Sequence, residues 1–179
     1  MNIFFVRHGA TVWNQTGKWQ GSVDTELSDH GRKQAMEAAE KLMSENFSVI
    51  YSSHKSRALE TAGIIAEKSG MDVVVDSRIA ERNMGIFEGM TTLEISSMMG
   101  REMNVVDIVS CTEPVEGMES LEDQFRRGKD FIDHVRNQQK DSVVVSHGVM
   151  IGIMLEILTG EDFRHRIIGN CQIIREKIL

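Results

Sequence analysis

The sequence predicts an α/β fold in which a mostly parallel sheet is sandwiched by helices. Short apolar, β-branched runs alternate along the chain with longer segments whose apolar residues recur at helical spacing. Several of the apolar runs end in polar, reactive side chains, as strands do at the ligand-binding edge of an open parallel sheet. No repeat, low-complexity segment or linker interrupts this alternation, so we expect residues 1–179 to form one domain.

The first half of the chain is expected to alternate strictly between strand and helix. Ser28 can cap the first long helix, and Gly70 suits the left-handed conformation that ends the second. The last strand of this half is rich in valine, which favours extended backbone. The expected elements are a strand over 2–6, a helix over 27–45, a strand over 47–53, a helix over 56–70 and a strand over 71–79.

The second half begins with an irregular stretch over 82–117. It contains one short helical candidate near 92–99 and the chain's single proline, Pro114. Regular alternation then resumes and continues to the end of the chain. The expected elements are a helix over 119–138, a buried strand over 141–148, a strongly apolar helix over 149–160 and a closing strand over 171–179.

Composition excludes several classes of protein. The net charge of −7 argues against general nucleic-acid binding, which needs a basic face. No apolar run approaches the ~18 to 20 residues that span a bilayer, and Arg7 and His8 come too early for a signal-peptide core. Cys111 and Cys171 are too few for a disulfide framework or a metal-ligand set. We therefore expect a cytoplasmic protein with no membrane or nucleic-acid partner.

Polar groups follow three of the predicted strands directly. Arg7-His8-Gly9 follows the first, Ser52-Ser53 with Arg57 follows the second, and Ser146-His147-Gly148 closes the strand over 141–148. The strand over 71–79 leads shortly into Glu81. A glycine after each histidine lets the backbone turn sharply and approach a ligand closely. A helix that begins after Gly148 would also direct free N–H groups to the same place.

This set of side chains suits phosphoryl transfer. Guanidinium groups match the oxygens of a phosphoryl group in charge and geometry. A neutral imidazole among them can attack phosphorus and form a phosphohistidine, which splits one difficult step into two. Glu81 could protonate the leaving oxygen and later take a proton from water. The expected partner is a small phosphorylated metabolite.

The remaining histidines and the missing motifs favour no other kind of site. A lone histidine is most often a satisfied polar residue, and we interpret His30, His54, His134 and His165 in this way. The two His-Gly pairs are harder to explain so simply. The sequence holds no HExxH or CxxC motif, and arginines beside the histidines would repel a cation, so no metal is expected. It also lacks the GxxxxGK[ST] and GxGxxG motifs of phosphate-binding loops.

Five segments, in order and at similar spacing, resemble the motifs of the histidine phosphatase superfamily, which includes the cofactor-dependent phosphoglycerate mutases and many small phosphatases. The resemblance covers nearly the whole chain and implies a phosphoglycerate mutase-like fold without a metal. The segments are RHGATVWN, KWQGSVDTELSDHGRKQA, SSHKSRALETA, IAERNMGIFEG and VVVSHG.

The resemblance also implies roles for individual residues. His8 is the residue that becomes phosphorylated, Arg7, Arg57 and His147 line the phosphate pocket with it, and Glu81 is the proton donor. Contacts to phosphate or substrate are implied for Asn14, Gln20, Gly21 and the backbone of Gly148.

Departures from the mutase pattern favour a phosphatase. Where typical mutases have lysine, tyrosine and asparagine, this chain has Thr92, Met84 and Val149, and Arg101 lacks the arginine partner expected near it. The leading expectation is hydrolysis of a small phosphomonoester. The alternative is a phosphoglycerate mutase that needs 2,3-bisphosphoglycerate as a primer, and a minor one is a non-catalytic phosphate-binding or scaffold protein. The sequence leaves the substrate and the oligomeric state open, a homodimer included.

Overall fold

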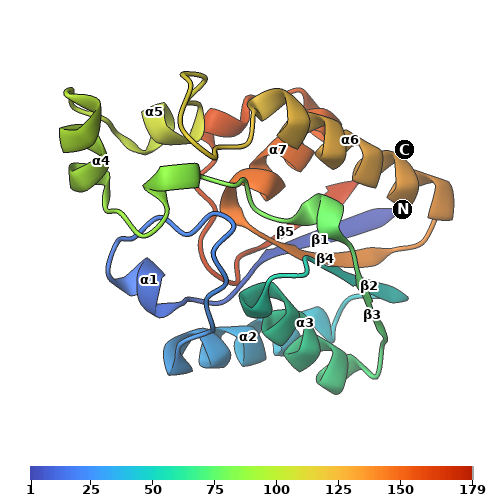
Figure 1. Cartoon of the computed structure of the whole chain (residues 1–179). Helices are drawn as coiled ribbons and strands as arrows, with labels where there is room; N and C mark the ends of the chain where they lie inside the picture. Colours follow the sequence, from blue (N-terminus) through green and yellow to red (C-terminus); the bar gives the residue numbers. More distant parts are fainter. Residues whose placement is uncertain (179) are drawn as a thin grey trace.

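The computed structural model describes residues 1–178 and places a five-stranded sheet at the centre of the molecule (Figure 1). Across the sheet the strands run in the order β3-β2-β4-β1-β5. β4 pairs in parallel with β1 and β2, β2 pairs in parallel with β3, and β5 alone runs antiparallel, beside β1. The predicted mostly parallel α/β fold is therefore confirmed. The strands are β1 (Asn2–Arg7), β2 (Val49–Ser52), β3 (Val73–Val75), β4 (Ser142–Ser146) and β5 (Ile173–Lys177).

Helices cover both faces of the sheet because side chains alternate along each buried strand. In β1, Ile3 and Phe5 pack into one apolar cluster with Phe131 and Met150, which come from α6 (Leu121–Gln138) and α7 (Gly148–Thr159). Phe4 and Val6 pack into the opposite cluster, against α2 (Asp29–Leu42) and α3 (Ser56–Ser69). Figure 1 shows these two helix pairs above and below the sheet.

The irregular region forms a third, smaller apolar cluster. Phe87, Ile95 and Ile108 are fully buried there, between the 3₁₀ turn η2 (Gly85–Phe87) and the helices α4 (Thr92–Met99) and α5 (Val105–Val109). In Figure 1 these helices and α1 (Val12–Gln15) lie to the left, on the opposite side of the molecule from the two termini. The region thus stands beyond the end of the sheet.

The structure corrects several predicted boundaries. The strand expected over 71–79 is only β3, because Asp76 caps the 3₁₀ turn η1 (Ser77–Ile79) and ends the extended backbone. The strand expected over 141–148 ends at Ser146, since His147 is already the N-cap of α7. The closing strand is confined to β5, and Leu179 lies outside the described residues. β1 is one residue longer than predicted, whereas β2, α2 and α3 are shorter than their predicted ranges. Ser28 and Gly70 cap α2 and α3 as predicted.

Three further elements were not predicted. α1 and α5 are each a single turn, held by capping boxes between Thr11 and Asn14 and between Asn104 and Asp107. The 3₁₀ turn η3 (Phe163–His165) lies between α7 and β5. Within residues 1–178 no helix combines the length and the apolar character needed to cross a bilayer.

Candidate active site

The carboxyl ends of β2, β4 and β1, which are adjacent in the sheet, bring the predicted site residues together. A cavity of about 530 Å³ opens at this edge. His147 is fully buried, and the centroid of its ring lies 5.1 Å from that of His8. The other eight predicted residues all line the cavity: Arg7, His8, Asn14, Gln20, Gly21, Arg57, Glu81 and Gly148.

His8 is held with one ring nitrogen free. Its Nδ1 lies 2.8 Å from the carbonyl oxygen of Gly9, and because a carbonyl can only accept, Nδ1 must carry the proton. The lone pair is then on Nε2. Burial, followed by the positive charges of Arg7 and Arg57, holds the pKa of His8 well below its usual value of 6.5. The imidazole is therefore neutral near pH 7 and can act as a nucleophile.

The ring of His147 is oriented by Ser53, a residue for which the sequence predicted a place at the end of a strand but no role. Its Nε2 lies 2.8 Å from Oγ of Ser53, and that oxygen also accepts a hydrogen bond from the backbone N–H of Lys55. The Ser53 hydroxyl is thus free to donate to Nε2, which favours the tautomer with its proton on Nδ1. Burial and then the charge of Arg57 hold the pKa of His147 well below 6.5. Nδ1 is buried and has no hydrogen-bond partner among residues 1–178.

Two arginines supply positive charge to the cavity. Arg57 is completely buried, and its two terminal nitrogens each donate at 2.8 Å, to the carbonyl oxygens of Val23 and Gly21. Arg7 donates to the carbonyl of Ile168. Burial lowers the pKa of both groups from the ordinary 12.5. Neither forms a salt bridge within the described part of the chain, and the Nε atom of each is buried without a partner there.

Asn14 and Gln20 are oriented by their amide oxygens. Oδ1 of Asn14 accepts from the backbone N–H of Thr11 at 3.1 Å as part of the α1 capping box. Oε1 of Gln20 lies 3.0 Å from the hydroxyl of Thr11 and 2.6 Å from that of Thr25. No residue from 1 to 178 accepts a hydrogen bond from either side-chain NH₂ group. Both groups remain available to an anion in the cavity.

Both carboxylate oxygens of Glu81 accept hydrogen bonds from the backbone. Its Oε1 accepts from the N–H of Arg82 at 2.9 Å, and its Oε2 accepts from the N–H of Val149, in the first turn of α7, at 3.2 Å. These contacts turn the carboxyl group towards the helix N-terminus beside Gly148. Glu81 therefore shares the cavity with His8 and Arg57.

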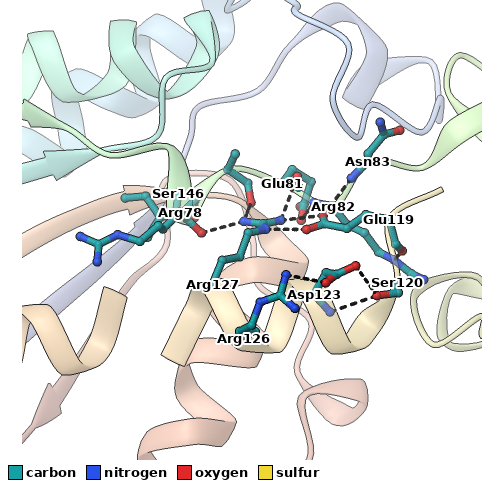
Figure 2. A network of polar contacts seen from close by, with 12 residues as sticks. Arg78, Glu81, Arg82, Asn83, Glu119, Ser120, Asp123, Arg126, Arg127 and Ser146 are labelled. Atoms are coloured by element: carbon teal, nitrogen blue, oxygen red, sulfur yellow. Dashed lines mark hydrogen bonds and ion pairs between the residues drawn. The ribbon is translucent and has the colours of Figure 1, made fainter. Parts of the chain in front are cut away.

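A network that the sequence did not reveal supports this carboxyl group (Figure 2). Arg127 of α6 donates to the carbonyl oxygens of Arg78, Ala80 and Glu81, at 2.7, 2.5 and 3.2 Å. Its guanidinium also pairs with both carboxylate oxygens of Glu119, at 2.7 and 2.9 Å. From β4, the Ser146 hydroxyl donates to the carbonyl of Ile79 at 2.7 Å. The backbone before Glu81 is thus fixed from two sides.

Arg82, next to Glu81 in the chain, has a structural position instead. It is almost completely buried and donates to three carbonyl oxygens, those of Val109, Cys111 and Glu119, at 3.1, 2.9 and 2.8 Å. The first two belong to the end of α5 and the residues after it. Arg82 therefore fixes α5 relative to the segment that carries Glu81.

Gly9 and Gly148, the glycines of the two His-Gly pairs, differ in the space around them. A Cβ at Gly9 would lie 2.4 Å from the carbonyl oxygen of Gly31, so this glycine is required by close backbone packing against the start of α2. Backbone packing is thus a reason for this glycine in addition to the predicted approach of a ligand. At Gly148 the nearest atom to such a Cβ is Cζ of Arg7, at 3.7 Å. Gly148 leaves space inside the cavity.

The positions that depart from the mutase pattern lie where they can affect a substrate. Thr92, Met84 and Val149 all line the cavity. Arg101 does not line it and pairs with Glu113 on the surface. Among residues 1–178 there is no group of three or more His, Cys, Asp or Glu side chains arranged to hold a metal ion.

Comparisons with known proteins identify the family of the chain. Phosphoserine phosphatase 1 from Hydrogenobacter thermophilus is 34% identical over 164 residues, which cover 90% of this chain and 78% of that protein. A probable phosphoglycerate mutase from Escherichia coli is 33% identical, with 98% and 84% covered. The structure of a mycobacterial glucosyl-3-phosphoglycerate phosphatase complexed with VO3 superposes with a TM-score of 0.86 at 27% identity, with 97% and 90% covered. Residues 3–177 match the family model described as histidine phosphatase superfamily (branch 1), and the chain therefore belongs to that superfamily as a phosphomonoesterase of the histidine phosphatase type.

Proposed function

We propose that the protein hydrolyses a small phosphomonoester metabolite in two steps, through a phosphohistidine at His8. The observation that carries this proposal is the state of His8, a neutral imidazole whose Nδ1 proton is held by Gly9. Its unprotonated Nε2 belongs to a side chain that lines the same cavity as two arginines and a carboxyl group. A nucleophile, an anion site and a proton donor are thus available together.

In the first step Nε2 of His8 forms a bond to phosphorus while the bond from phosphorus to the ester oxygen breaks. The leaving oxygen takes the proton of Glu81, so an alcohol departs and a carboxylate remains. In the second step that carboxylate takes a proton from water, whose oxygen attacks phosphorus. The P–N bond breaks and inorganic phosphate leaves, which restores neutral His8 and protonated Glu81.

The surrounding groups stabilise the transferred phosphoryl group. Its charge would be met by Arg7, Arg57 and the Nδ1 proton of His147, and by the free backbone N–H of Gly148 at the positive end of α7. The NH₂ groups of Asn14 and Gln20 can donate to the same oxygens. Because these donors are fixed by other contacts, little reorganisation is needed during the reaction.

Trapping of the intermediate tests the proposal directly. Rapid acid-free quenching after mixing with a ³²P-labelled phosphomonoester should show labelled protein, and the label should map to His8. The His8→Ala variant should lose the label and at least about 10³-fold of the activity. His30→Ala changes an exposed histidine outside the cavity and is the matched control. Undiminished turnover in the His8 variant would overturn the proposal.

The alternative is a phosphoglycerate mutase, which the similarity to the probable mutase from Escherichia coli keeps open. The absence of the mutase tyrosine, lysine and asparagine at Met84, Thr92 and Val149 favours water as the acceptor instead. Phosphorus NMR with 3-phosphoglycerate separates the two, with and without a trace of 2,3-bisphosphoglycerate. Release of inorganic phosphate supports a phosphatase, whereas 2-phosphoglycerate that forms only with the primer would establish a mutase.

A further inference from the structure

We infer that the organic group of the substrate is apolar and uncharged, and that it binds against Val105 and Val106 of α5 and against Ile167. This inference rests on the proposed phosphatase activity and specifies its substrate class. It concerns the part of the cavity beyond the phosphate-binding groups. A cavity of about 530 Å³ lies within the ~300 to 1,000 Å³ of typical ligand pockets, so it has room for much more than a phosphoryl group.

Large apolar side chains on the wall of this cavity are exposed to water. Ile167 is 90% exposed, Val105 53% and Val106 41%, although all three line the cavity. The wall continues inward with Val109 and Phe163, which are buried. Single exposed apolar residues are ordinary, but several that line one cavity beside a catalytic site indicate a surface that a ligand covers. Apolar substrate groups would remove this surface from water.

The basic side chains on the wall are largely neutralised by their neighbours. Arg164 binds both carboxylate oxygens of Asp162 through its Nε, at 2.9 and 2.8 Å. Arg166 pairs with Glu161, at 2.5 Å. Of the basic groups that line the cavity outside the phosphate site, Lys18 and His165 alone have no ion pair within residues 1–178, and Lys18 lies over the ring of Trp13. Outside the phosphate site, each arginine that lines the cavity is therefore already paired with a carboxylate of the protein.

The wall is also held rigidly. Asn104 caps α5, and Arg82 binds the carbonyl oxygens of Val109 and Cys111 at the other end of the helix. A rigid apolar surface gains more from burying a ligand than a flexible one, because little conformational entropy is lost on binding. Phosphoserine and phosphoglycerate, which carry a carboxylate and little apolar surface, would use this wall poorly.

Binding without turnover tests the inference independently of the chemistry. We would measure calorimetric dissociation constants for straight-chain alkyl phosphonates from methyl to hexyl, which cannot be hydrolysed at the P–C bond. Affinity should rise about two- to fourfold for each added methylene until the wall is covered. A hexyl phosphonate with a terminal carboxylate should bind at least tenfold more weakly than hexyl phosphonate itself.

Two variants and a control connect the effect to the wall. Val105→Thr and Val106→Thr keep the size of the side chain and add a hydroxyl group, so each should flatten the dependence on chain length while methyl phosphonate binds as before. Val75→Thr alters a valine of β3 that is 54% exposed and does not line the cavity, and it should change nothing.

Hydrolysis of the matching alkyl phosphates separates failure of this inference from failure of the proposed function. Turnover with a flat dependence on chain length, or a preference for phosphoserine and 3-phosphoglycerate, would overturn the inference and leave the phosphatase intact. Phosphonate affinity that rises with chain length, without turnover of any ester, would support the apolar binding surface and overturn the proposed phosphatase activity.

Discussion

Positive charge is concentrated in the active site on two arginines that form no salt bridge within the described residues. Arg57 is fully buried and donates only to backbone carbonyls, and Arg7 is also without an ion pair in the described residues. Burying a cation in this way destabilises the empty protein, as the lowered pKa of both groups indicates. A bound phosphate dianion would offset this cost.

Inorganic phosphate should therefore stabilise the protein. At a concentration of 100 times its dissociation constant, a ligand of the folded state raises the free energy of unfolding by about 2.7 kcal/mol. Thermal unfolding with and without phosphate measures the shift. Arg57→Met should remove most of it. Arg32→Met, which breaks exposed ion pairs with Asp29 and Glu60 on α2 and α3, should retain it. An equal shift in the Arg57 variant would contradict the assignment of Arg57 to the anion site.

The two His-Gly pairs lead to a second prediction for single residues. Gly9→Ala should destabilise the fold by about 1–3 kcal/mol, since its Cβ would overlap the Gly31 carbonyl and force the backbone apart. Gly148→Ala should leave the midpoint of urea unfolding almost unchanged but raise KM, because its Cβ would enter the cavity beside Arg7. Similar loss of stability in both variants would show that the second glycine is also needed for packing.

Among the elements, α6 has the least obvious connection to the site. It covers one face of the sheet, yet its Arg127 donates to three backbone carbonyl oxygens before and at Glu81, in the network of Figure 2. The neighbouring Arg126 pairs instead with Asp123 on the surface. We therefore propose that Arg127 positions Glu81, the proposed proton donor, and Arg126 offers a matched control.

Arg127→Met should lower kcat/KM, which reports the steps up to formation of the phosphoenzyme, in a way that depends on the leaving group. In the proposed mechanism an alkyl alcohol needs a proton from Glu81 as it departs, whereas p-nitrophenolate leaves without one. We expect a loss of roughly 10²-fold in kcat/KM with methyl phosphate, but less than about fivefold with p-nitrophenyl phosphate, and no loss with either for Arg126→Met. Equal losses on both substrates would indicate general disruption of the fold.

The elements also show what sequence can predict. β1, β2 and β4 were predicted because their apolar runs are clear, and the parallel sheet then required Arg7, Arg57 and His147 to converge at one edge. α1 and α5 are too short for a helical period to be visible, and their capping boxes appear only once the loops are placed. Arg127 gives no local signal, since a charged residue on an amphipathic helix is normally exposed. Its role depends on contacts with a segment far away in the chain.

At the scale of the whole molecule, the fold brings two neutral histidines into its interior from opposite halves of the chain. β1 and β4 are neighbours in register, with Arg7 opposite Ser146, so the residues that follow them, His8 and His147, meet at the same edge. Helices on both faces then bury them. The same burial that keeps His8 nucleophilic therefore links the stability of the entire protein to pH.

Stability should fall as the pH drops below about 6.5, where histidines of the unfolded chain become protonated. His8 and His147 have pKa values well below that in the folded state, so the unfolded chain binds more protons in this window, and the contribution is fully present above it. Each histidine should remove up to about 1.4 kcal/mol from the free energy of unfolding per pH unit. His54 is exposed, but desolvation also lowers its pKa, so it adds a smaller effect of the same sign. Urea unfolding between pH 7.5 and 5.5 measures the slope above the range in which Asp and Glu titrate. His147→Asn should reduce that slope by about half, and the exposed His30→Asn should preserve it. An unchanged slope in the His147 variant would show that this histidine is accessible to protons in the folded state.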